Sequence, residues 1–244
     1  MFFSSNTVSV KDSGLLEGFC DYHCHLLPGV DDGVKDMHET IHILERLEQL
    51  GVSHVWLTPH IMEDYPNQPA QLKQRFDLLV SQFATLHASP SALTLHLAAE
   101  NMLDGVFVER LQDNNLLTIT TDSYTSLLLI ETSYYIPPMN MENLIDRIKE
   151  KDFKPLLAHP ERYQYMRNDD YRRWKQKGVL LQLNVPSLVG AYGEEAQHKA
   201  EWLLNQGMYD CCGTDIHSIS HLDYFLNGMI KKKTIRQLHG LPQL

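Results

Sequence analysis

The chain is poor in cysteine, and its cysteines are not spaced for a structural role. Four occur among 244 residues: Cys20, Cys24 and the adjacent pair Cys211 and Cys212. None forms a C-x-x-C pair, so the sequence predicts neither a zinc knuckle nor a disulfide framework. We therefore expect reduced thiols that are buried on two outer strands.

Basic residues are scarce relative to acidic ones. The chain has 21 lysines and arginines against 31 aspartates and glutamates, which gives a formal net charge of -10. A general nucleic-acid partner is not expected, because binding to nucleic-acid phosphates requires a basic surface. An anionic substrate is not excluded, because bound divalent ions would reverse the local electric field.

Long apolar segments are also lacking. No run approaches the roughly 20 apolar residues that cross a bilayer, so we expect no membrane insertion. Residues 1–5 contain no basic segment ahead of an apolar one, and a signal peptide is not predicted. The cytoplasm is the expected location.

The apolar residues that are present, 43% of the chain, suffice for one sizeable core. After an amino-terminal arm at residues 1–18, strand-like and helix-like segments alternate, which predicts parallel strands with right-handed crossovers. Several strands are continuously apolar, as strands covered on both faces are. The expected strands are 19–25, 53–58, 94–99, 126–131, 154–158, 179–185 and 209–213.

Helical patterns fill the gaps. Asp36 with Glu39 resembles a capping box, which predicts a helix from there to Leu50 that stops at Gly51. An apolar stripe with helical spacing is formed by Leu72, Phe76, Leu79, Phe83 and Leu86. Further helices are expected around residues 144–148, 174 and 202. Seven strand–helix units predict an α/β fold, a distorted (β/α)7 TIM-like barrel in a single domain at residues 19–244.

Residues that bind metals recur at the predicted strand ends. His23 and His25 lie on the same face of a strand, because side chains alternate with period two, and this places two imidazoles side by side. Asp215 and His217 repeat that spacing after the last strand. In a parallel barrel the active site lies at the C-terminal strand ends. The candidates there are His23, His25, Asp32, His60, Glu100, Glu131, His159, Asp215 and His217.

Glu100 and Glu131 strengthen this prediction, since each ends an apolar run. A carboxylate is costly to bury unless it is paired or bound to a metal. One metal-dependent site assembled at the ends of successive strands is therefore predicted.

The motifs HCH, GVDDG, TPH, AAE, LLIE, AHPER and TDIH, in this order, resemble the polymerase and histidinol phosphatase (PHP) superfamily between residues 19 and 222. GVDDG combined with AHPERY is similar to its bacterial branch of manganese-dependent protein-tyrosine phosphatases, encoded with capsule and exopolysaccharide genes. The resemblance implies the PHP fold, with the active site at the C-terminal ends of the strands.

The resemblance also implies three divalent metal ions in a row and one phosphate-binding arginine. The first ion would be held by His23, His25, Glu100 and Asp215, the second by Glu100, Glu131 and His159, and the third by Asp32, His60 and His217. Arg162 matches the arginine by its place in AHPER and is the implied catalytic residue. A simple surface ion pair of Arg162 with Glu161 or another neighbour is the alternative.

Imidazole and carboxylate ligands without thiolate suit Mn, Fe or Zn, and ligand type alone does not choose among them; the resemblance implies manganese. Three such ions with four carboxylates leave a charge of about +2, and Arg162 raises it to about +3, which would hold a phosphate dianion. Metal coordination lowers the pKa of water to about 7. The implied reaction is attack of that hydroxide on phosphorus, with Arg162 stabilising the phosphoryl oxygens.

A cysteine-dependent tyrosine phosphatase is excluded, because its thiolate needs an arginine six residues later. The residues at that spacing here are Leu26, Val30, His217 and Ser218. Tyr134 and Tyr135 follow Glu131 closely. They form either an aromatic rim that binds the phenyl ring of a substrate or simple loop packing, and both interpretations stay open.

The resemblance implies a phosphotyrosine protein as substrate, in particular the tyrosine-rich tail of a bacterial tyrosine autokinase, and so a role in regulating capsule or exopolysaccharide synthesis. The alternatives are a small-molecule phosphatase such as histidinol phosphatase, a metal-dependent amidohydrolase and a non-catalytic metal-binding regulator. Amidohydrolases usually bridge their metals with a carbamylated lysine, whereas strands here end in Glu100 and Glu131.

Overall fold

The structure is a computed structural model that describes residues 6–85, 91–124, 126–242 and 244. All seven predicted strands are present, with ends within one or two residues of the expected ones. They are β2 (Cys20–Cys24), β3 (His54–Leu57), β5 (Thr94–Leu97), β7 (Leu127–Glu131), β8 (Lys154–Leu157), β9 (Leu180–Asn184) and β10 (Cys211–Gly213). Two further strands, β4 (His60–Ile61) and β6 (Glu100–Met102), continue the directions of β3 and β5.

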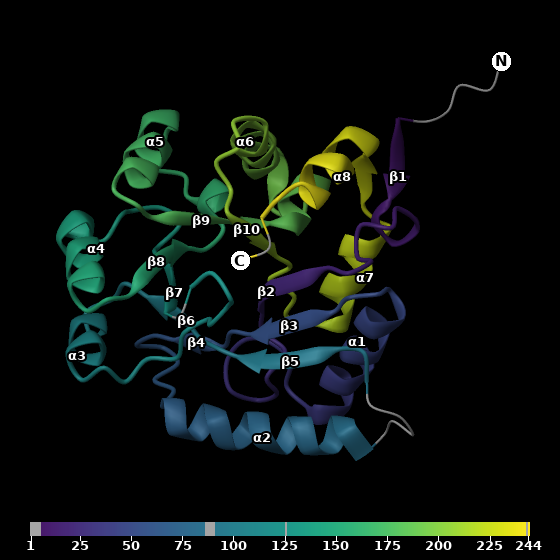
Figure 1. Cartoon of the computed structure of the whole chain (residues 1–244), viewed down its shortest axis with the longest axis horizontal. Helices are drawn as coiled ribbons and strands as arrows, with labels where there is room; N and C mark the ends of the chain where they lie inside the picture. The colour runs from purple at the N-terminus through teal and green to yellow at the C-terminus, as the bar shows by residue number, and fades with distance from the viewer. Residues whose placement is uncertain (1–5, 86–90, 125, 243) are drawn as a thin grey trace.

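These strands form a curled parallel arrangement with helices on the outside (Figure 1). One sheet has the order β10-β9-β8-β7-β6-β4 and the other the order β2-β3-β5. The division falls where β3 passes into β4, at Thr58 and Pro59, and where β5 passes into β6. Proline has no N–H for a ladder hydrogen bond, which is one reason for the break. The α/β prediction is confirmed, while the hydrogen bonds do not define one regular seven-stranded sheet.

Eight α-helices lie in the described part of the chain. They are α1 (Met37–Gln49), α2 (Pro69–Thr85), α3 (Phe107–Gln112), α4 (Met141–Glu150), α5 (Asn168–Gln176), α6 (Gly193–Asn205), α7 (Ile219–Asn227) and α8 (Lys232–His239). As predicted, the Asp36 side chain caps α1 by accepting from the Glu39 N–H at 3.0 Å. The α2 stripe is buried at Leu72, Leu79 and Phe83, and its last predicted member, Leu86, lies outside the described residues. The sequence patterns did not reveal the short helices α3, α7 and α8.

The continuously apolar strands are covered on both faces, as predicted. In β7, Leu127 and Leu129 join a small cluster inside the curl, whereas Leu128 and Ile130 join the large core against the helices. The inner cluster also contains Tyr22 and Trp56. It fills the interior beneath the strand ends and so supports the residues that project from them.

Residues 6–18, which belong to the predicted arm, pack against the carboxyl-terminal part of the chain. β1 (Thr7–Ser9) pairs antiparallel with β11 (Met229–Lys231), and Val10 is buried directly after β1. Neither strand was predicted, because three residues are too few to show a period. No helix in the described part of the chain is long and apolar enough to cross a membrane.

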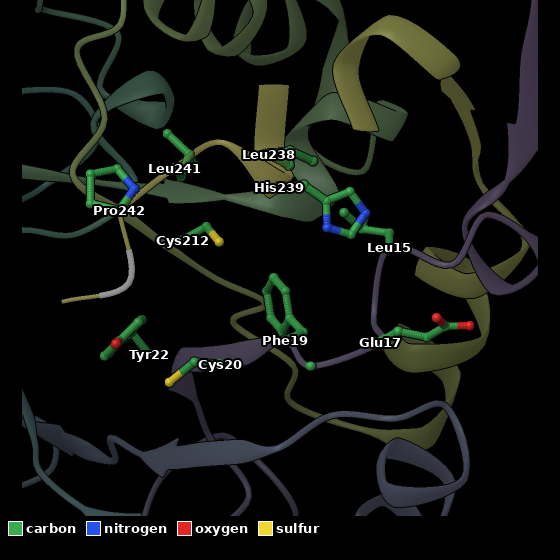
Figure 2. A pocket seen from close by; sticks show the side chains of 11 residues that line it. Leu15, Glu17, Phe19, Cys20, Tyr22, Cys212, Leu238, His239, Leu241 and Pro242 are labelled. Atoms are coloured by element: carbon green, nitrogen blue, oxygen red, sulfur yellow. The ribbon is translucent and has the colours of Figure 1, made fainter. Parts of the chain in front are cut away.

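A small cavity lies at the amino-terminal ends of β2 and β10 (Figure 2). Its volume is about 60 Å³, and Phe19, Cys20, Cys212 and Leu241 are among its lining residues. Burial raises the pKa of the Cys20 thiol to about 12, so the thiol stays protonated at neutral pH. This end of the curled sheet is opposite to the strand ends that carry the predicted ligands.

Candidate metal centre and active site

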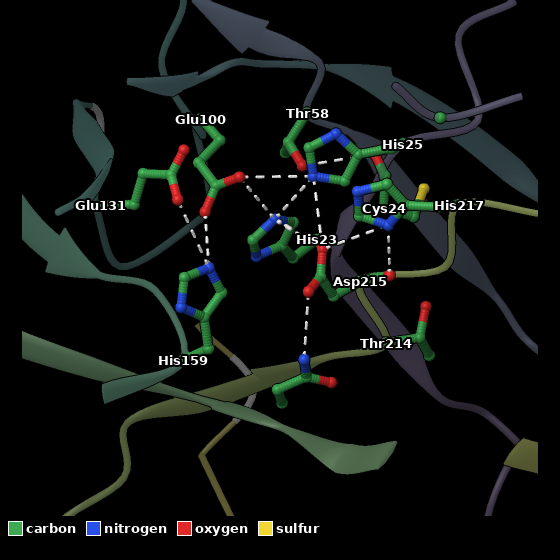
Figure 3. A network of polar contacts seen from close by, with 12 residues as sticks. His23, Cys24, His25, Thr58, Glu100, Glu131, His159, Thr214, Asp215 and His217 are labelled. Atoms are coloured by element: carbon green, nitrogen blue, oxygen red, sulfur yellow. Dashed lines mark hydrogen bonds and ion pairs between the residues drawn. The ribbon is translucent and has the colours of Figure 1, made fainter. Parts of the chain in front are cut away.

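The nine predicted ligands come from six strands or strand ends and one loop. His23 lies in β2, His60 in β4, Glu100 in β6 and Glu131 in β7, and the other strand-associated residues follow β2, β8 or β10 directly. Asp32 lies in the loop after β2. Figure 3 shows His23, His25, Glu100 and Asp215 pointing toward one another, with Glu131 and His159 beside Glu100. The structure thus brings all of the predicted ligands together.

The first group surrounds the Nε2 atoms of His23 and His25, which are 3.1 Å apart. Glu100 Oε2 lies 3.2 Å from the His23 atom and 3.3 Å from the His25 atom. Asp215 Oδ1 lies 3.5 Å and 3.3 Å from the same two atoms. Two imidazole nitrogens and two carboxylate oxygens therefore converge at one point, as the motif comparison implied for the first ion.

The second group is centred on the carboxylates of Glu100 and Glu131. His159 Nε2 is 2.8 Å from Glu100 Oε1 and 3.9 Å from Glu131 Oε2. His60 Nδ1 lies near both carboxylates, at 3.1 Å from Glu100 Oε2 and 2.9 Å from Glu131 Oε1, and it is closer to Glu131 than His159 is. The histidine predicted for the third ion thus lies between the second and third groups.

The third group lies at the more exposed edge of the site. Asp32 Oδ1 is 3.5 Å from His60 Nε2 and 3.7 Å from His217 Nε2. The rings of His25 and His217 are stacked, with their centroids 4.1 Å apart. The side chain of Asp32 is 49% exposed, whereas Glu100 is fully buried, so this edge is the open side of the cluster.

The donor atoms fit bound cations better than they fit one another. His60 Nδ1 lies close to Glu100 Oε2 and Glu131 Oε1, but among the described residues none of these three buried atoms forms a hydrogen bond of suitable geometry. Buried polar atoms are normally hydrogen-bonded. The same three residues form one of three groups whose donor atoms lie within 4.8 Å of one another. Nitrogen and oxygen donors at such spacing suit divalent transition metals.

The carboxylates dominate the electrostatics of the cluster. Burial alone would lower the pKa of His23, but Glu100 and Asp215 outweigh it and raise the pKa to about 9. Burial opposes ionisation of Glu100, yet His23, His60 and His159 hold its pKa well below the ordinary value. The cluster thus places ionised carboxylates in a buried space that attracts positive charge.

Residues behind the ligands hold them in position. His23 Nδ1 donates to Gln182 Oε1 at 2.7 Å, and His25 Nδ1 donates to Asp31 Oδ2 at 2.8 Å. Asn184 Nδ2 donates to Asp215 Oδ2 at 3.1 Å. Such contacts orient metal-binding imidazoles and increase their basicity. Sequence reasoning missed these roles, although the position of Asp31 next to Asp32 was a usable signal.

Gln182→Met is expected to weaken metal binding on the order of 10- to 100-fold, as loss of an orienting partner typically does. Methionine keeps the volume of the buried side chain but offers His23 no comparable acceptor. Titration of metal-free protein with Mn²⁺ measures the effect, with the exposed Gln206→Met as the matched control. Unchanged affinity in Gln182→Met would show that this contact does not orient His23.

Two ligand positions have an unusual backbone. His159 has φ 33° and Asp215 has φ 53°, both in the left-handed region. His159 also precedes Pro160, and a proline disfavours helical conformations at the preceding residue. Each such residue costs on the order of 1–3 kcal/mol. The surrounding fold maintains this strain, which turns both side chains toward the cluster.

Arg162 lies in the 3-10 helix η2 (Pro160–Arg162), directly after His159. Its NH1 donates to Asp215 Oδ2 at 2.6 Å. The guanidinium carbon lies 4.5 Å from the ring centroid of Tyr134 and 4.0 Å from that of Tyr192. Although burial favours the neutral form, Asp215 raises the pKa of Arg162 above its ordinary value. A permanent cation is thus clamped between two aromatic rings beside the ligands.

The two tyrosines predicted at the rim behave differently. Tyr134 is half-buried with its ring near Arg162 and His159, whereas Tyr135 is 68% exposed. Both line a pocket of about 260 Å³ together with Arg162, Tyr192 and Lys199. For Tyr134, both interpretations remain open: a rim that binds the phenyl ring of a substrate, or loop packing. Tyr135 lies on the outer edge of the pocket.

Sequence reasoning missed Tyr192 altogether. Its hydroxyl donates to Asp215 Oδ2 at 3.4 Å and lies 3.2 Å from Nε2 of His221, which is in α7. Tyr192 therefore contacts a predicted ligand and the predicted catalytic arginine at once. It follows the 3-10 helix η3 (Val185–Val189), outside any strand end, so the pattern that located the ligands did not apply to it.

The family follows from comparison with known proteins. A family model described as capsular polysaccharide synthesis, CpsB/CapC, matches residues 19–232. The chain belongs to the CpsB/CapC family. The resemblance drawn from the motifs to this capsule-associated branch is thereby confirmed.

The individual relatives are distant in sequence. Tyrosine-protein phosphatase YwqE of Bacillus subtilis is 26% identical over 206 residues, with 82% of this chain and 77% of YwqE covered. The putative tyrosine-protein phosphatase CapC of Staphylococcus aureus is 24% identical, with 88% of this chain and 84% of CapC covered. CpsB of Streptococcus pneumoniae, also a tyrosine-protein phosphatase, is 23% identical, with 82% and 83% covered.

The fold is shared with a solved structure. A crystal structure from work on YwqE of Bacillus subtilis and CpsB of Streptococcus pneumoniae, described as metal-dependent tyrosine phosphatases, matches with a TM-score of 0.74. The match covers 85% of each chain at 24% identity. It shows that this chain shares the fold of that structure.

Proposed function

We propose that this chain is a metal-dependent protein-tyrosine phosphatase that hydrolyses phosphate monoesters. The observation that carries the proposal is the convergence of nine nitrogen- and oxygen-bearing side chains beside a clamped arginine. The names of the family relatives support the same activity. Hydrolysis of p-nitrophenyl phosphate that requires added metal and stops with a chelator tests it. Full activity in metal-free protein would refute it.

We propose three divalent ions, with manganese ahead of iron or zinc. His23, His25, Glu100 and Asp215 would hold the first ion. Glu100 would also bind the second ion. The His60 ring offers Nδ1 to one group and Nε2 to another, so it is placed to take part in either. When bound, the ions would activate a water for attack and draw charge from the phosphoryl oxygens.

The protein itself supplies binding and orientation. Arg162 presents guanidinium N–H groups next to Asp215, where they would donate to equatorial phosphoryl oxygens as charge develops. Tyr134 and Tyr192 already hold the guanidinium between their rings. The long Arg162 side chain therefore loses less conformational freedom when it binds the phosphate. The leaving tyrosine has a pKa near 10, so we assign no general acid.

We further propose that the two sheets act as one distorted seven-stranded barrel of the PHP type, formed by residues 19–244 with 1–18 as an accessory arm. Backbone hydrogen bonds at both divisions support this. At the first division Ala98 N donates to Leu57 O at 2.9 Å and Glu100 N donates to Pro59 O at 3.2 Å, and at the second His25 N donates to Ile216 O at 2.9 Å. These hydrogen bonds link the strands of one sheet to those of the other around the site.

For the physiological role, we propose dephosphorylation of a tyrosine autokinase tail and, through it, regulation of capsule or exopolysaccharide synthesis. The family match supports the connection with capsular polysaccharide. Histidinol phosphate and other small phosphate esters are the alternative substrates. The centre of the cluster is occupied by Glu100 and Glu131 rather than by lysine, which disfavours an amidohydrolase that uses carbamylated lysine.

Phosphotyrosine peptides are expected to be hydrolysed much faster than phosphoserine peptides of the same sequence. A long aryl side chain reaches buried ligands from the rim, and its phenolate is a better leaving group than an alkoxide. Phosphate release from matched peptide pairs, at equal metal content, measures the ratio. Equal rates on both peptides would indicate a general phosphatase, and hydrolysis of histidinol phosphate alone would favour the small-molecule alternative.

A further inference from the structure

The loop between β7 and α4 exposes large apolar side chains next to the candidate site. The three most exposed large apolar residues in the described part of the chain are Met139 at 89%, Ile136 at 70% and Tyr135 at 68%. Single exposed apolar residues are common on protein surfaces. Three of them within five residues, beside a binding pocket, indicate an interaction surface.

A groove of about 600 Å³ lies beside this loop. Pro137, Pro138 and Met141 line one part of it, and Tyr165, Met166 and Trp174 line another. Two cations balance the two carboxylates of the groove, because the Arg173 guanidinium lies 3.5 Å from Glu142 and 3.4 Å from Asp170, and Lys177 Nζ lies 3.2 Å from Glu142. With its charges compensated in this way, the groove suits an apolar side chain better than a charged one.

The groove and the candidate site share a wall. Gln164 N donates to Tyr134 O at 2.8 Å, and the hydroxyls of Thr132 and Tyr165 are 2.6 Å apart. On one side of this wall the Tyr134 ring faces Arg162, and on the other side Tyr165 lines the groove. Ile136 lies in the chain between Tyr135, which lines the Arg162 pocket, and Pro137, which lines the groove.

We propose that Ile136, Met139 and the groove form a docking surface for apolar side chains that flank the phosphotyrosine of a protein substrate. The inference rests on the proposed phosphatase function. With the phosphate held at Arg162, the rest of a substrate polypeptide has to leave the pocket across its rim. The pocket is continuous with the exposed apolar loop, so the polypeptide is expected to leave on this side. The groove beside the loop has its charges compensated, so it favours apolar side chains.

The test compares metal-loaded wild-type protein with Ile136→Ser and Met139→Ser. Both side chains are largely exposed, so neither substitution disturbs the core. The substrates are p-nitrophenyl phosphate and two phosphotyrosine peptides, one with leucine and valine flanks and one with serine and glycine flanks. Met229→Ser, in β11 and 54% exposed, is the matched control.

Wild-type protein should prefer the apolar-flanked peptide, and both loop variants should lower its kcat/KM on the order of tenfold, as loss of apolar pocket contacts does. Their rates on p-nitrophenyl phosphate, and all rates of Met229→Ser, should be unchanged. No preference between the peptides, or unchanged loop variants, would overturn the docking surface and leave the phosphatase function intact. If the wild-type protein is a dimer and either variant is a monomer, the surface binds a second copy of the chain rather than a substrate, and the proposal is overturned. Wild-type protein inactive on all three substrates would overturn both proposals.

Discussion

Glu100→Gln is expected to reduce hydrolysis of p-nitrophenyl phosphate below detection, a larger loss than the 10²–10³ typical for one transition-state donor. The Glu100 carboxylate lies within 3.3 Å of nitrogen atoms from His23, His25, His60 and His159. It is the only predicted ligand assigned to two ions, so the neutral amide should weaken both of these sites at once. Metal analysis of the purified variant should show fewer ions per chain than in wild type.

A control separates this effect from a general loss of negative charge. Glu142→Gln makes the same change at a side chain that is 50% exposed, and it should leave metal content and rate unchanged. A folded Glu100→Gln protein with full metal content and near-normal rate would refute the shared-ligand role. Circular dichroism and the thermal midpoint establish that the variant is folded.

Arg162→Ala should lower kcat on the order of 10²–10³ while all metal ions stay bound. A guanidinium has no lone pair for a cation, because it stays protonated, so its removal takes away a phosphate donor rather than a ligand. Arg162 contacts Asp215 through Oδ2, whereas Oδ1 faces the two histidines. The oxygen directed at the metal site is therefore not the one that Arg162 holds. Steady-state kinetics with metal analysis on the same samples provides the measurement.

His159→Ala, three residues away, should instead lose metal as well as activity, because it removes a ligand. Arg172→Ala is the matched arginine control, on the exposed side of α5. Tyr192→Phe keeps the ring against the guanidinium and should retain much of the rate, whereas Tyr192→Leu removes the ring and should approach the loss in Arg162→Ala. A near-normal rate in Arg162→Ala would leave the metal ions as the whole of the phosphate site.

The ligand positions were predictable from local patterns because of the geometry of parallel strands. A strand reads as an apolar run, and its C-terminal end lies at the same rim as the ends of its neighbours. His23, Glu131 and Asp215 could therefore be assigned to one site without knowledge of their distances. The pattern could not assign His60 Nδ1 to Glu131, because that contact depends on the side-chain torsions of both residues.

Residues outside the strand ends were beyond such patterns. Gln182 and Tyr192 carry no motif, and each acts through contacts with residues distant in sequence. The different exposure of Tyr134 and Tyr135 likewise depends on how the β7–α4 loop packs against residues 163–165. Packing of this kind follows from the whole chain, since each contact requires that distant segments have already been brought together.

The sequence by itself determined the order of the seven main strands and of five helices, the types of residue at each strand end and the exclusion of a cysteine nucleophile. These properties depend on the periodicity of side chains along strands and helices and on the chemistry of residues that are close in sequence. Only the tertiary structure decided where the parallel arrangement breaks, how β2 meets the segment after β10, and which donor atoms face one another. The Asp215 N–H bonds to His23 O at 2.7 Å, joining opposite ends of the chain. This contact forms only when all the strands and helices between the two residues have packed together, and a local sequence pattern does not contain that information.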